Sequence, residues 1–168
     1  MKSEIIETFE ETTKKFLTTL QSFDSANINQ VPFEGSWTAA QVADHVLKSQ
    51  QGLPGILGGK TEPTDRKPEE KRETVQKIFL DYSTKMKSPD FILPSLQDHD
   101  REELIAHVKN TSSHILKAMQ THELDKICKG FELPNMGPFT GFEWGWFAIY
   151  HTQRHIHQME NIRSYVIN

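Results

Sequence analysis

Two histidines four residues apart near the end of the chain, His151 and His155, are the residues whose type and spacing point most directly to chemistry. In an α-helix, positions i and i+4 lie roughly 40° apart on one face, so two imidazoles can be aimed at one point. A third histidine, His45, lies much earlier, on the inward stripe of a separate amphipathic segment. Three histidines with no other protein ligand form an open metal site of the catalytic type. The pattern therefore predicts a metal held by His45, His151 and His155.

The residue directly after His151 limits which reactions such a metal site could catalyse. Neutral imidazole nitrogen suits zinc, nickel, copper and iron(II). In metallopeptidases with two histidines four apart, a glutamate beside the first histidine acts as the general base, but this chain has Thr152 there. A metal can itself lower the pKa of a bound thiol or water without an adjacent carboxylate. The pattern favours activation of a thiol or of water over proteolysis, and it assigns no further catalytic residue.

Other interpretations of these histidines remain open at this stage. A pair at i and i+4, taken alone, is more often two core or surface histidines with no ligand role. His107 and His114 are seven residues apart, share one helix face and are the strongest competitors for the third ligand position. They flank the apolar stripe of their helix, whereas His45 lies on such a stripe. The remaining histidines are expected at helix ends or on the surface: His99, His122 and His157.

Several neighbours of the paired histidines have more than one possible role. Gln158 follows His155 by three residues and can make an outer contact to a metal ligand. Arg154 can donate to an anionic substrate group or, at least as readily, to a backbone carbonyl. Most of the aromatic residues around Trp144 and Phe147 are expected to pack in the core, with one or two lining the pocket above the metal. Cys128 lies between two lysines that could lower its thiol pKa, but a lone loop cysteine is a weak catalytic candidate.

Two capping boxes predict where the histidine-bearing helices begin. Thr38 with Gln41 opens the helix of the first histidine, and Thr140 with Glu143 opens a long final helix that carries the other two. Further helices are expected at about 4–23, at 68–87 and after Asp100, separated by loops rich in proline and glycine. No strand pattern is evident; residues 91–93 are apolar but lie between prolines and are at most a short extended segment. The expected fold is all-α, a four-helix bundle with one additional shorter helix.

Composition sets broader limits. With 168 residues, the chain is expected to form a single domain over 1–168. The formal net charge of -4 gives no reason to expect nucleic acid or an anionic membrane as a partner. A single cysteine excludes an internal disulfide and suits a reducing cytoplasm. The first residues lack an apolar core of signal-peptide length, and no apolar run approaches the ~20 residues that span a bilayer, so a cytoplasmic location is expected.

Two segments of the chain resemble signatures of the DinB-like superfamily. They are Ser36–His45, with the sequence SWTAAQVADH, and the spaced set Tyr150-His151, Arg154-His155 and Gln158. Each motif is short and degenerate, but their order and wide separation also match. The resemblance implies a four-helix bundle with a divalent metal, zinc or nickel, on His45, His151 and His155. It also implies a homodimer.

The resemblance implies two classes of function. Members are described as metal-dependent hydrolases, and better understood relatives are S-transferases that use bacillithiol or mycothiol, or a mycothiol-dependent maleylpyruvate isomerase. The first hypothesis is an enzyme that activates a low-molecular-weight thiol or water for attack on a small electrophilic substrate, in detoxification or stress response. The alternative is a non-catalytic, metal-binding or ligand-binding stress-related bundle with a vestigial site. Fold resemblance does not transmit a substrate.

Overall fold

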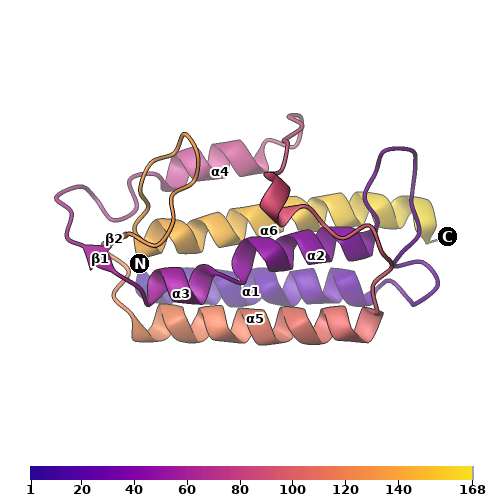
Figure 1. Ribbon diagram of the computed structural model, residues 1–168, viewed down its shortest axis with the longest axis horizontal. Helices are drawn as coiled ribbons and strands as arrows, with labels where there is room; N and C mark the ends of the chain where they lie inside the picture. The colour runs from indigo at the N-terminus through magenta and orange to yellow at the C-terminus, as the bar shows by residue number, and fades with distance from the viewer. Residues whose placement is uncertain (168) are drawn as a thin grey trace.

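The computed structural model describes residues 1–167, and it confirms the all-α bundle (Figure 1). Four helices are long: α1 (Lys2–Gln21), α2 (Ala39–Gln50), α5 (Arg101–Thr121) and α6 (Gly141–Val166). The shorter elements are α3 (Leu53–Leu57), α4 (Arg72–Leu80) and the 3-10 helix η1 (Asp90–Ile92). Within residues 1–167, no helix has both the length and the apolar character needed to span a membrane.

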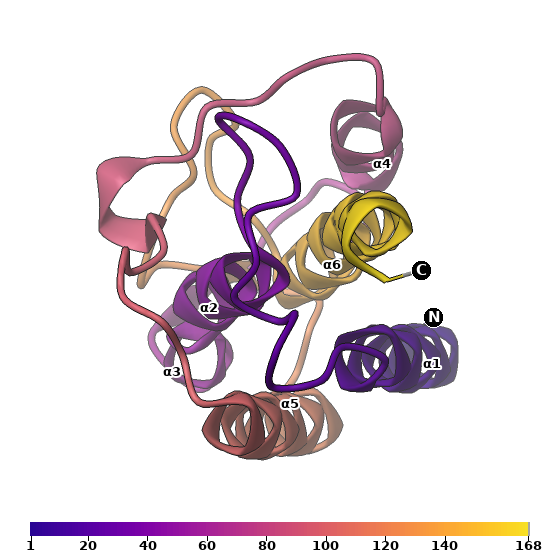
Figure 2. The same cartoon turned by 90° about the vertical axis from the view of Figure 1, so that its right-hand side faces the viewer.

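The four long helices surround a common core, as Figure 2 shows along the bundle axis. Helix α6 packs against α1 and α2, and α5 packs against the same two helices from the other side. Helix α3 follows α2 closely in the chain and extends its contact with α5. Helix α4 lies outside this ring and packs against α6. The additional shorter helix that the sequence predicts is thus present, but it covers the outside of the last helix.

Two apolar clusters fill the core, and the paired histidines lie between them. The first cluster takes α6 side chains from Phe142 to Tyr150 together with residues of α1, α3, α4 and α5. The second takes Ile156, Met159 and Ile162 of α6 together with the buried face of α2. Apolar burial on both sides fixes the rotation of α6, because a turned helix would expose one cluster or the other. That rotation also fixes the direction of the histidine pair.

Both predicted capping boxes are present at the starts of α2 and α6. The Thr38 Oγ1 accepts from the Gln41 backbone N–H at 3.1 Å, and the Gln41 Oε1 accepts from the Thr38 N–H at 3.0 Å. Thr140 and Glu143 make the same reciprocal pair at α6. Each box satisfies two backbone donors that a helix start would otherwise leave without partners. Both histidine-bearing helices therefore begin where the sequence predicts.

The helix expected over 68–87 is shorter in the structure, at Arg72–Leu80. The chain leaves the helix at Asp81, whose carboxylate accepts hydrogen bonds from the Ser83 backbone N–H at 3.0 Å, the Ser83 hydroxyl and Thr84. Short polar side chains that bind nearby backbone and hydroxyl groups compete with helix continuation. Asp81 therefore ends the helix earlier than its apolar spacing suggests.

Two further differences concern extended segments. Residues 90–92 form the 3-10 helix η1, whereas the sequence indicates at most a short extended segment at 91–93. The short strands β1 (Thr61–Glu62) and β2 (Ile127–Cys128) pair antiparallel, which no alternation in the sequence had indicated. Strands of two residues are too short to show a period-two pattern, so tertiary proximity alone produces them.

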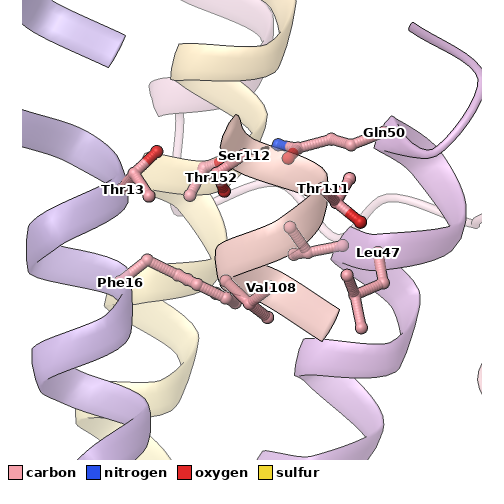
Figure 3. Close-up of a pocket in the computed structure, with 9 residues that line it drawn as sticks. Thr13, Phe16, Leu47, Gln50, Val108, Thr111, Ser112 and Thr152 are labelled. Atoms are coloured by element: carbon pink, nitrogen blue, oxygen red, sulfur yellow. Dashed lines mark hydrogen bonds between the residues drawn. The ribbon is translucent and has the colours of Figure 1, made fainter. Parts of the chain in front are cut away.

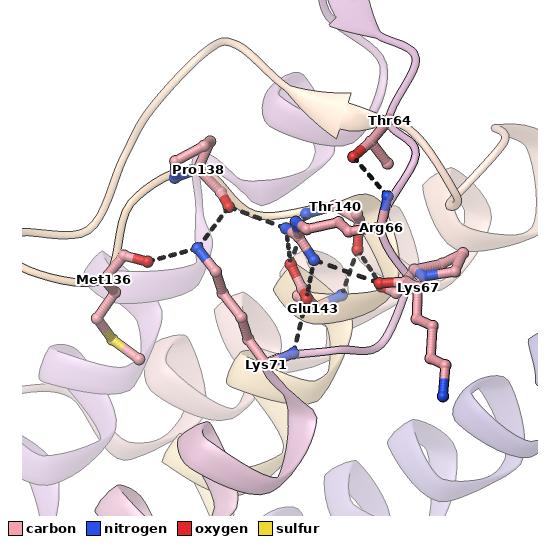
Figure 4. Close-up of polar contacts among 9 residues, drawn as sticks. Thr64, Arg66, Lys67, Lys71, Met136, Pro138, Thr140 and Glu143 are labelled. Atoms are coloured by element: carbon pink, nitrogen blue, oxygen red, sulfur yellow. Dashed lines mark hydrogen bonds and ion pairs between the residues drawn. The ribbon is translucent and has the colours of Figure 1, made fainter.

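A buried ionic network anchors the start of α6 (Figure 4). Glu143 is fully buried, and its carboxylate takes two hydrogen bonds of 2.6 Å from the Arg66 guanidinium and one of 2.9 Å from the Lys71 backbone N–H. The Lys71 ammonium in turn donates to the carbonyls of Met136 and Pro138. The network ties two loops that are distant in sequence to the end of the helix that carries the paired histidines.

Candidate metal centre

The structure brings the three predicted histidines together in space. His45 comes from α2, and His151 and His155 come from α6. The Nε2 atom of His151 lies 3.1 Å from Nε2 of His45 and 3.1 Å from Nε2 of His155. One ligand atom from each residue lies within 4.8 Å of the other two, and all three side chains are buried. Within residues 1–167, this is the one group of three histidine, cysteine or acidic side chains arranged to hold a metal ion.

Hydrogen bonds at the Nδ1 atoms of His45 and His155 set the protonation of their rings. The Nδ1–H of His45 donates to the Ile92 backbone carbonyl at 2.8 Å. The Nδ1–H of His155 donates to the Gln158 Oε1, also at 2.8 Å. A carbonyl oxygen can only accept, so each proton lies on Nδ1 and each Nε2 presents a lone pair. This is the arrangement in which a histidine binds a metal through Nε2 and donates through its other nitrogen.

His151 reaches the same state through a serine. The Ser49 Oγ lies 3.3 Å from Nδ1 of His151, and the same hydroxyl donates its hydrogen to the Val46 carbonyl at 2.7 Å. Because that hydrogen is already engaged, the serine oxygen acts as the acceptor for His151. The contact is longer than the other two and correspondingly weaker. All three Nε2 atoms thus present lone pairs to the same small volume.

The spacing of these nitrogens fits a divalent metal. With metal–nitrogen bonds of about 2.0–2.1 Å, nitrogens are about 3.3 Å apart in a tetrahedral site and about 2.9 Å apart at right angles. The two observed separations of 3.1 Å lie between these values. Three lone pairs that face one another with no proton between them repel, and a cation at their centre reverses the sign of that interaction. The donor set therefore suits zinc, nickel and other imidazole-binding ions.

Burial keeps the three rings neutral. Loss of solvation lowers the pKa of His45 and holds the pKa of His151 well below its usual range, with the neighbouring rings adding to the effect at His151. Burial followed by the nearby His45 lowers the pKa of His155 to about 3. Metal binding requires the neutral form of imidazole. The fold therefore holds the three histidine rings in the neutral form that binding of a metal ion would require.

Aromatic rings surround the histidine cluster. Phe147 stacks on the His151 ring with centroids 5.4 Å apart, and Phe79 meets the same ring edge-on at 5.6 Å. Trp37 lies 5.0 Å from the ring of His45. An apolar surround excludes water and strengthens electrostatic interactions at a bound ion.

A strap formed by residues 92–95 covers α2 beside the cluster. Besides His45, three side chains of α2 bind the backbone of this strap: Gln41 and Asp44 to Ser95, and Lys48 to Leu93. The distances are 3.1, 2.7 and 2.9 Å, respectively. Their spacing on α2 puts all of them on one helix face. The strap therefore holds the Ile92 carbonyl in place for His45.

The other histidines lie outside the cluster. The two competitors for the third ligand position, His107 and His114, are exposed on α5. His157 is exposed and stacks on Tyr82, with ring centroids 4.0 Å apart. His99 lies 3.7 Å from the Asp44 carboxylate, and His122 is exposed after the end of α5. His45 is buried because it lies on the inward face of its helix, and this position, already indicated by the sequence, distinguishes it from His107 and His114.

The neighbouring residues take definite roles. The contact expected between Gln158 and His155 is present. Arg154 donates to the backbone carbonyls of Phe79, Asp81 and Thr84, which is the structural one of its two expected roles. The idea that lysines lower the thiol pKa of Cys128 is wrong. That thiol is buried, and burial raises its pKa to about 11.

Two contributors to the site were not identified as such from the sequence. Ser49 shares the apolar stripe of His45, one turn further along α2, and a polar residue at that position was a usable signal. Ile92 contributes only its backbone carbonyl, and no side-chain pattern reports where a carbonyl will point. The site thus includes groups from α2, the strap and α6.

A small cavity lies among the four long helices (Figure 3). It is lined by side chains of α1, α2, α5 and α6, including Thr13, Gln50, Ser112 and Thr152. Its volume of about 10 Å³ is room for about one water molecule. A substrate therefore cannot bind in this space.

The model of the DinB superfamily matches residues 8–159, and the chain belongs to that superfamily. Among solved structures, the chain is similar to TT2238, a four-helix bundle protein, with a TM-score of 0.61 and 19% sequence identity over 96% of this chain and 99% of that one. It is also similar to YfiT from Bacillus subtilis, described as a probable metal-dependent hydrolase with an unusual four-helix bundle topology. That match has a TM-score of 0.61 and 16% identity over 97% of this chain and 86% of that one. The search of curated proteins found no match. These likenesses confirm the predicted family and fold.

Proposed function

We propose that this protein is a divalent-metal-dependent enzyme that activates water or a low-molecular-weight thiol for attack on a small electrophile. A cation held by His45, His151 and His155 supplies acidity to a coordinated water or thiol. The observation that carries the proposal is the set of three Nε2 lone pairs, each fixed by an acceptor at Nδ1 and all directed at one point. The description of YfiT as a probable metal-dependent hydrolase supports the hydrolytic form.

The residue beside the first α6 histidine supports this type of chemistry over peptidase chemistry. The Thr152 hydroxyl donates to the Ala148 carbonyl at 2.7 Å and accepts from the Gln50 amide at 2.7 Å. Both interactions hold it within the bundle, and a hydroxyl is a poor base. Position 152 therefore supplies no general base beside His151, which favours a nucleophile that a cation alone can activate.

Metal analysis of protein purified without a histidine tag or chelator tests the first part of the proposal. We expect stoichiometric zinc or nickel, measured by elemental analysis, and loss of that metal in His151→Ala. The matched control is His157→Ala on the same helix, which should retain metal because His157 is exposed outside the cluster. Equal metal content in the two variants would overturn the assignment of ligands.

Turnover assays test the second part. The zinc-loaded and nickel-loaded forms are assayed with activated esters in the absence of thiol, and with aryl halides in the presence of glutathione, bacillithiol or mycothiol. Ester cleavage indicates the hydrolase, and thiol-dependent loss of halide indicates the transferase. A well-folded, metal-loaded protein that gives no turnover with either set would instead identify a non-catalytic metal-binding bundle.

We also propose that the protein forms a homodimer. Exposed apolar side chains gather where the loop before α2 meets the end of α6: Val31, Phe33 and Tyr165. The rings of Phe33 and Tyr165 pack 5.1 Å apart, and clustered exposed apolar groups are typical of interaction surfaces. Light scattering should give twice the mass of the chain, and Phe33→Ser should shift the species toward monomer.

A further inference from the structure

A line of aromatic rings leads from the surface to the histidine cluster, and we call it the ring track. It consists of Phe91 of η1, Phe131 of the loop before α6, and Trp144 and Phe147 of α6. Successive centroids lie 6.0, 6.0 and 5.6 Å apart, and Phe147 then stacks on His151. Phe91 and Phe131 are 67% and 38% exposed, whereas the two α6 rings are buried. In the end-on view of Figure 2, η1 and the loop before α6 lie on the same side of α6.

Trp144 carries a polar group that the fold leaves unused. The side chain is 2% exposed, and its indole N–H has no acceptor within residues 1–167. Trp146, on the same helix, instead donates its indole N–H to the Glu69 carboxylate at 2.5 Å. A buried donor without a partner costs stability, and such a group calls for a specific explanation.

The position of Trp144 on α6 relates this donor to the metal site. Trp144 precedes His151 by seven residues, which is close to two helical turns. The two side chains therefore lie within roughly 20° of the same helix face and about 10 Å apart along the axis. Phe147 lies between them and contacts both rings. A flat molecule about 10 Å long can contact the indole at one end and the histidine cluster at the other.

The charge of the surroundings restricts what such a molecule can be. No ring of the track is charged. The cation nearest in sequence to the histidines, Arg154, has its guanidinium directed at three backbone carbonyls beyond α4. The rings that contact the cluster from its other sides, Trp37 and Phe79, are also neutral. An anionic group buried among these neutral rings would be desolvated, which is unfavourable without a cationic partner. A cation on the histidines would supply such a partner only to a group that reaches the cluster itself.

We propose that the ring track binds the electrophilic substrate, and that this substrate is a neutral, flat, apolar molecule with a hydrogen-bond acceptor that receives the Trp144 N–H. Phe131, on a loop and partly exposed, covers the indole and moves aside as the substrate enters. The inference rests on the proposed function for the reaction, but binding to the track is measured without turnover.

Three probes of similar size separate the contributions of the hydrogen bond and of charge to binding. They are measured by calorimetry on the metal-free full chain, where no cation at the histidines can bind a probe directly. The probes are acetylnaphthalene, which is neutral and has an acceptor; ethylnaphthalene, which is neutral and has none; and naphthoate, which is anionic. A single neutral hydrogen bond changes affinity by about 2-fold to 10-fold. We expect acetylnaphthalene to bind more tightly than ethylnaphthalene by about this factor, and naphthoate to bind most weakly.

Two variants and one control complete the test. Trp144→Phe keeps a ring and removes the N–H, so the preference for acetylnaphthalene over ethylnaphthalene should disappear. Phe131→Ala should weaken both neutral probes. The control is Tyr82→Ala, which removes an exposed aromatic ring that stacks on His157 and lies outside the track. It should leave both affinities unchanged.

The outcomes distinguish this inference from the proposed function. An unchanged acetyl preference in Trp144→Phe, or tight binding of naphthoate, overturns the inference. Circular dichroism establishes that the variants are folded, and Trp144→Phe alone decides the question if Phe131→Ala does not fold. Failure of the proposed function would appear separately, as zinc content that does not depend on His151. Probe binding by the metal-free chain would remain measurable in that case.

Discussion

Gln158 acts on the candidate metal centre through a single hydrogen bond. Its Oε1 accepts the Nδ1 proton of His155 and so leaves Nε2 available as a ligand. Outer contacts of this type are typically worth 10-fold to 100-fold in metal affinity. Ser49 has the same role for His151 over a longer distance, so its removal should matter less.

We therefore expect Gln158→Ala to weaken zinc affinity by about 10-fold or more, measured by competition with a chromophoric chelator. Gln153→Ala is the matched control. Gln153 lies on the same helix and its amide contacts Thr12 on α1, with no contact to the cluster. If the two variants lose affinity equally, the effect comes from general loosening of α6 and not from the orientation of His155.

The thiol of Cys128 gives a prediction at alkaline pH. Burial raises its pKa from 9.0 to about 11 in the folded chain, so the unfolded chain loses this proton first as the pH rises. The contribution of the thiol to stability is therefore complete below about pH 9 and is lost between about pH 9 and pH 11. We expect the free energy of unfolding to fall by about 1 kcal/mol from this group between about pH 8 and pH 10.

Denaturant titrations of the wild-type chain and of Cys128→Ala measure this effect. Lysines also titrate in this range, and the alanine variant contains the same lysines. The difference between the two proteins isolates the thiol. A pH dependence that is identical in both would show that Cys128 is accessible to solvent in the folded chain.

At the scale of elements, the strap over 92–95 depends on α2 for its position. Asp44 accepts from the Ser95 backbone N–H at 2.7 Å and also binds the Lys48 ammonium at 2.9 Å. We expect Asp44→Ala to release the strap, to displace the Ile92 carbonyl from His45 and to weaken zinc affinity by about 10-fold. Calorimetric zinc titration measures the change.

A second variant separates the strap from a direct effect of charge beside His45. Lys48→Ala removes the ammonium that donates to the Leu93 carbonyl and leaves Asp44 in place. It should weaken zinc affinity in the same direction, although the variant makes the local charge more negative. Tighter zinc binding by Lys48→Ala would show that charge, and not the strap, governs the affinity.

The same elements show what the sequence could and could not predict. The starts of α2 and α6 were predictable because a capping box is a local signal within four residues. The grouping of three histidines on inward faces followed from helical spacing. The predicted length of α4 was wrong. The carboxylate of Asp81 binds nearby donors and ends the helix at a point where the helical spacing of apolar residues continues. Whether the three histidines bind a metal stays a prediction.

Some parts of the site could not be predicted because they depend on tertiary contacts. The Ile92 carbonyl reaches His45 only because the strap folds back along α2. The pairing of Arg66 with Glu143 joins positions 77 residues apart, and nothing in the sequence near either residue reports the other. The exposure of Phe91 beside Phe131 likewise follows from how two loops meet.

At the scale of the whole molecule, the ion pair between the partly exposed Arg66 and the fully buried Glu143 holds the loops to the bundle. Removing one partner of such a pair leaves an uncompensated charge and costs about 3–5 kcal/mol. We expect Arg66→Ala to lower the melting temperature by roughly 6–20 °C in a single cooperative transition, as the predicted single domain requires. Calorimetry measures both the shift and the cooperativity.

The exposed pair of Lys77 and Glu73 provides the matched control. Lys77→Ala removes a surface ion pair on α4, which should change stability little. Similar melting temperatures for Arg66→Ala and Lys77→Ala would contradict a structural role for the buried network. Two separate transitions in either variant would contradict the single domain.

Metal removal should also act on the whole molecule. An ion bound to His45 and His151 joins positions 106 residues apart in the chain. Anything that binds the folded chain alone stabilises it by mass action, by about 2.7 kcal/mol at a hundredfold excess over the dissociation constant. We expect a chelator to lower the melting temperature of the wild-type protein and to leave that of His151→Ala unchanged, as measured by scanning fluorimetry.

The distance in sequence between α2 and α6 has a consequence for the life of the protein in a cell. An ion bound to both helices would be a removable cross-link between early and late parts of the chain. Chains made during metal starvation would lack this cross-link and would open more often. Proteases cleave the opened form, and abundance would then follow metal supply without any change in transcription. Limited proteolysis with and without chelator would show this directly: the half-life of the wild-type chain should shorten, and that of His151→Ala should not.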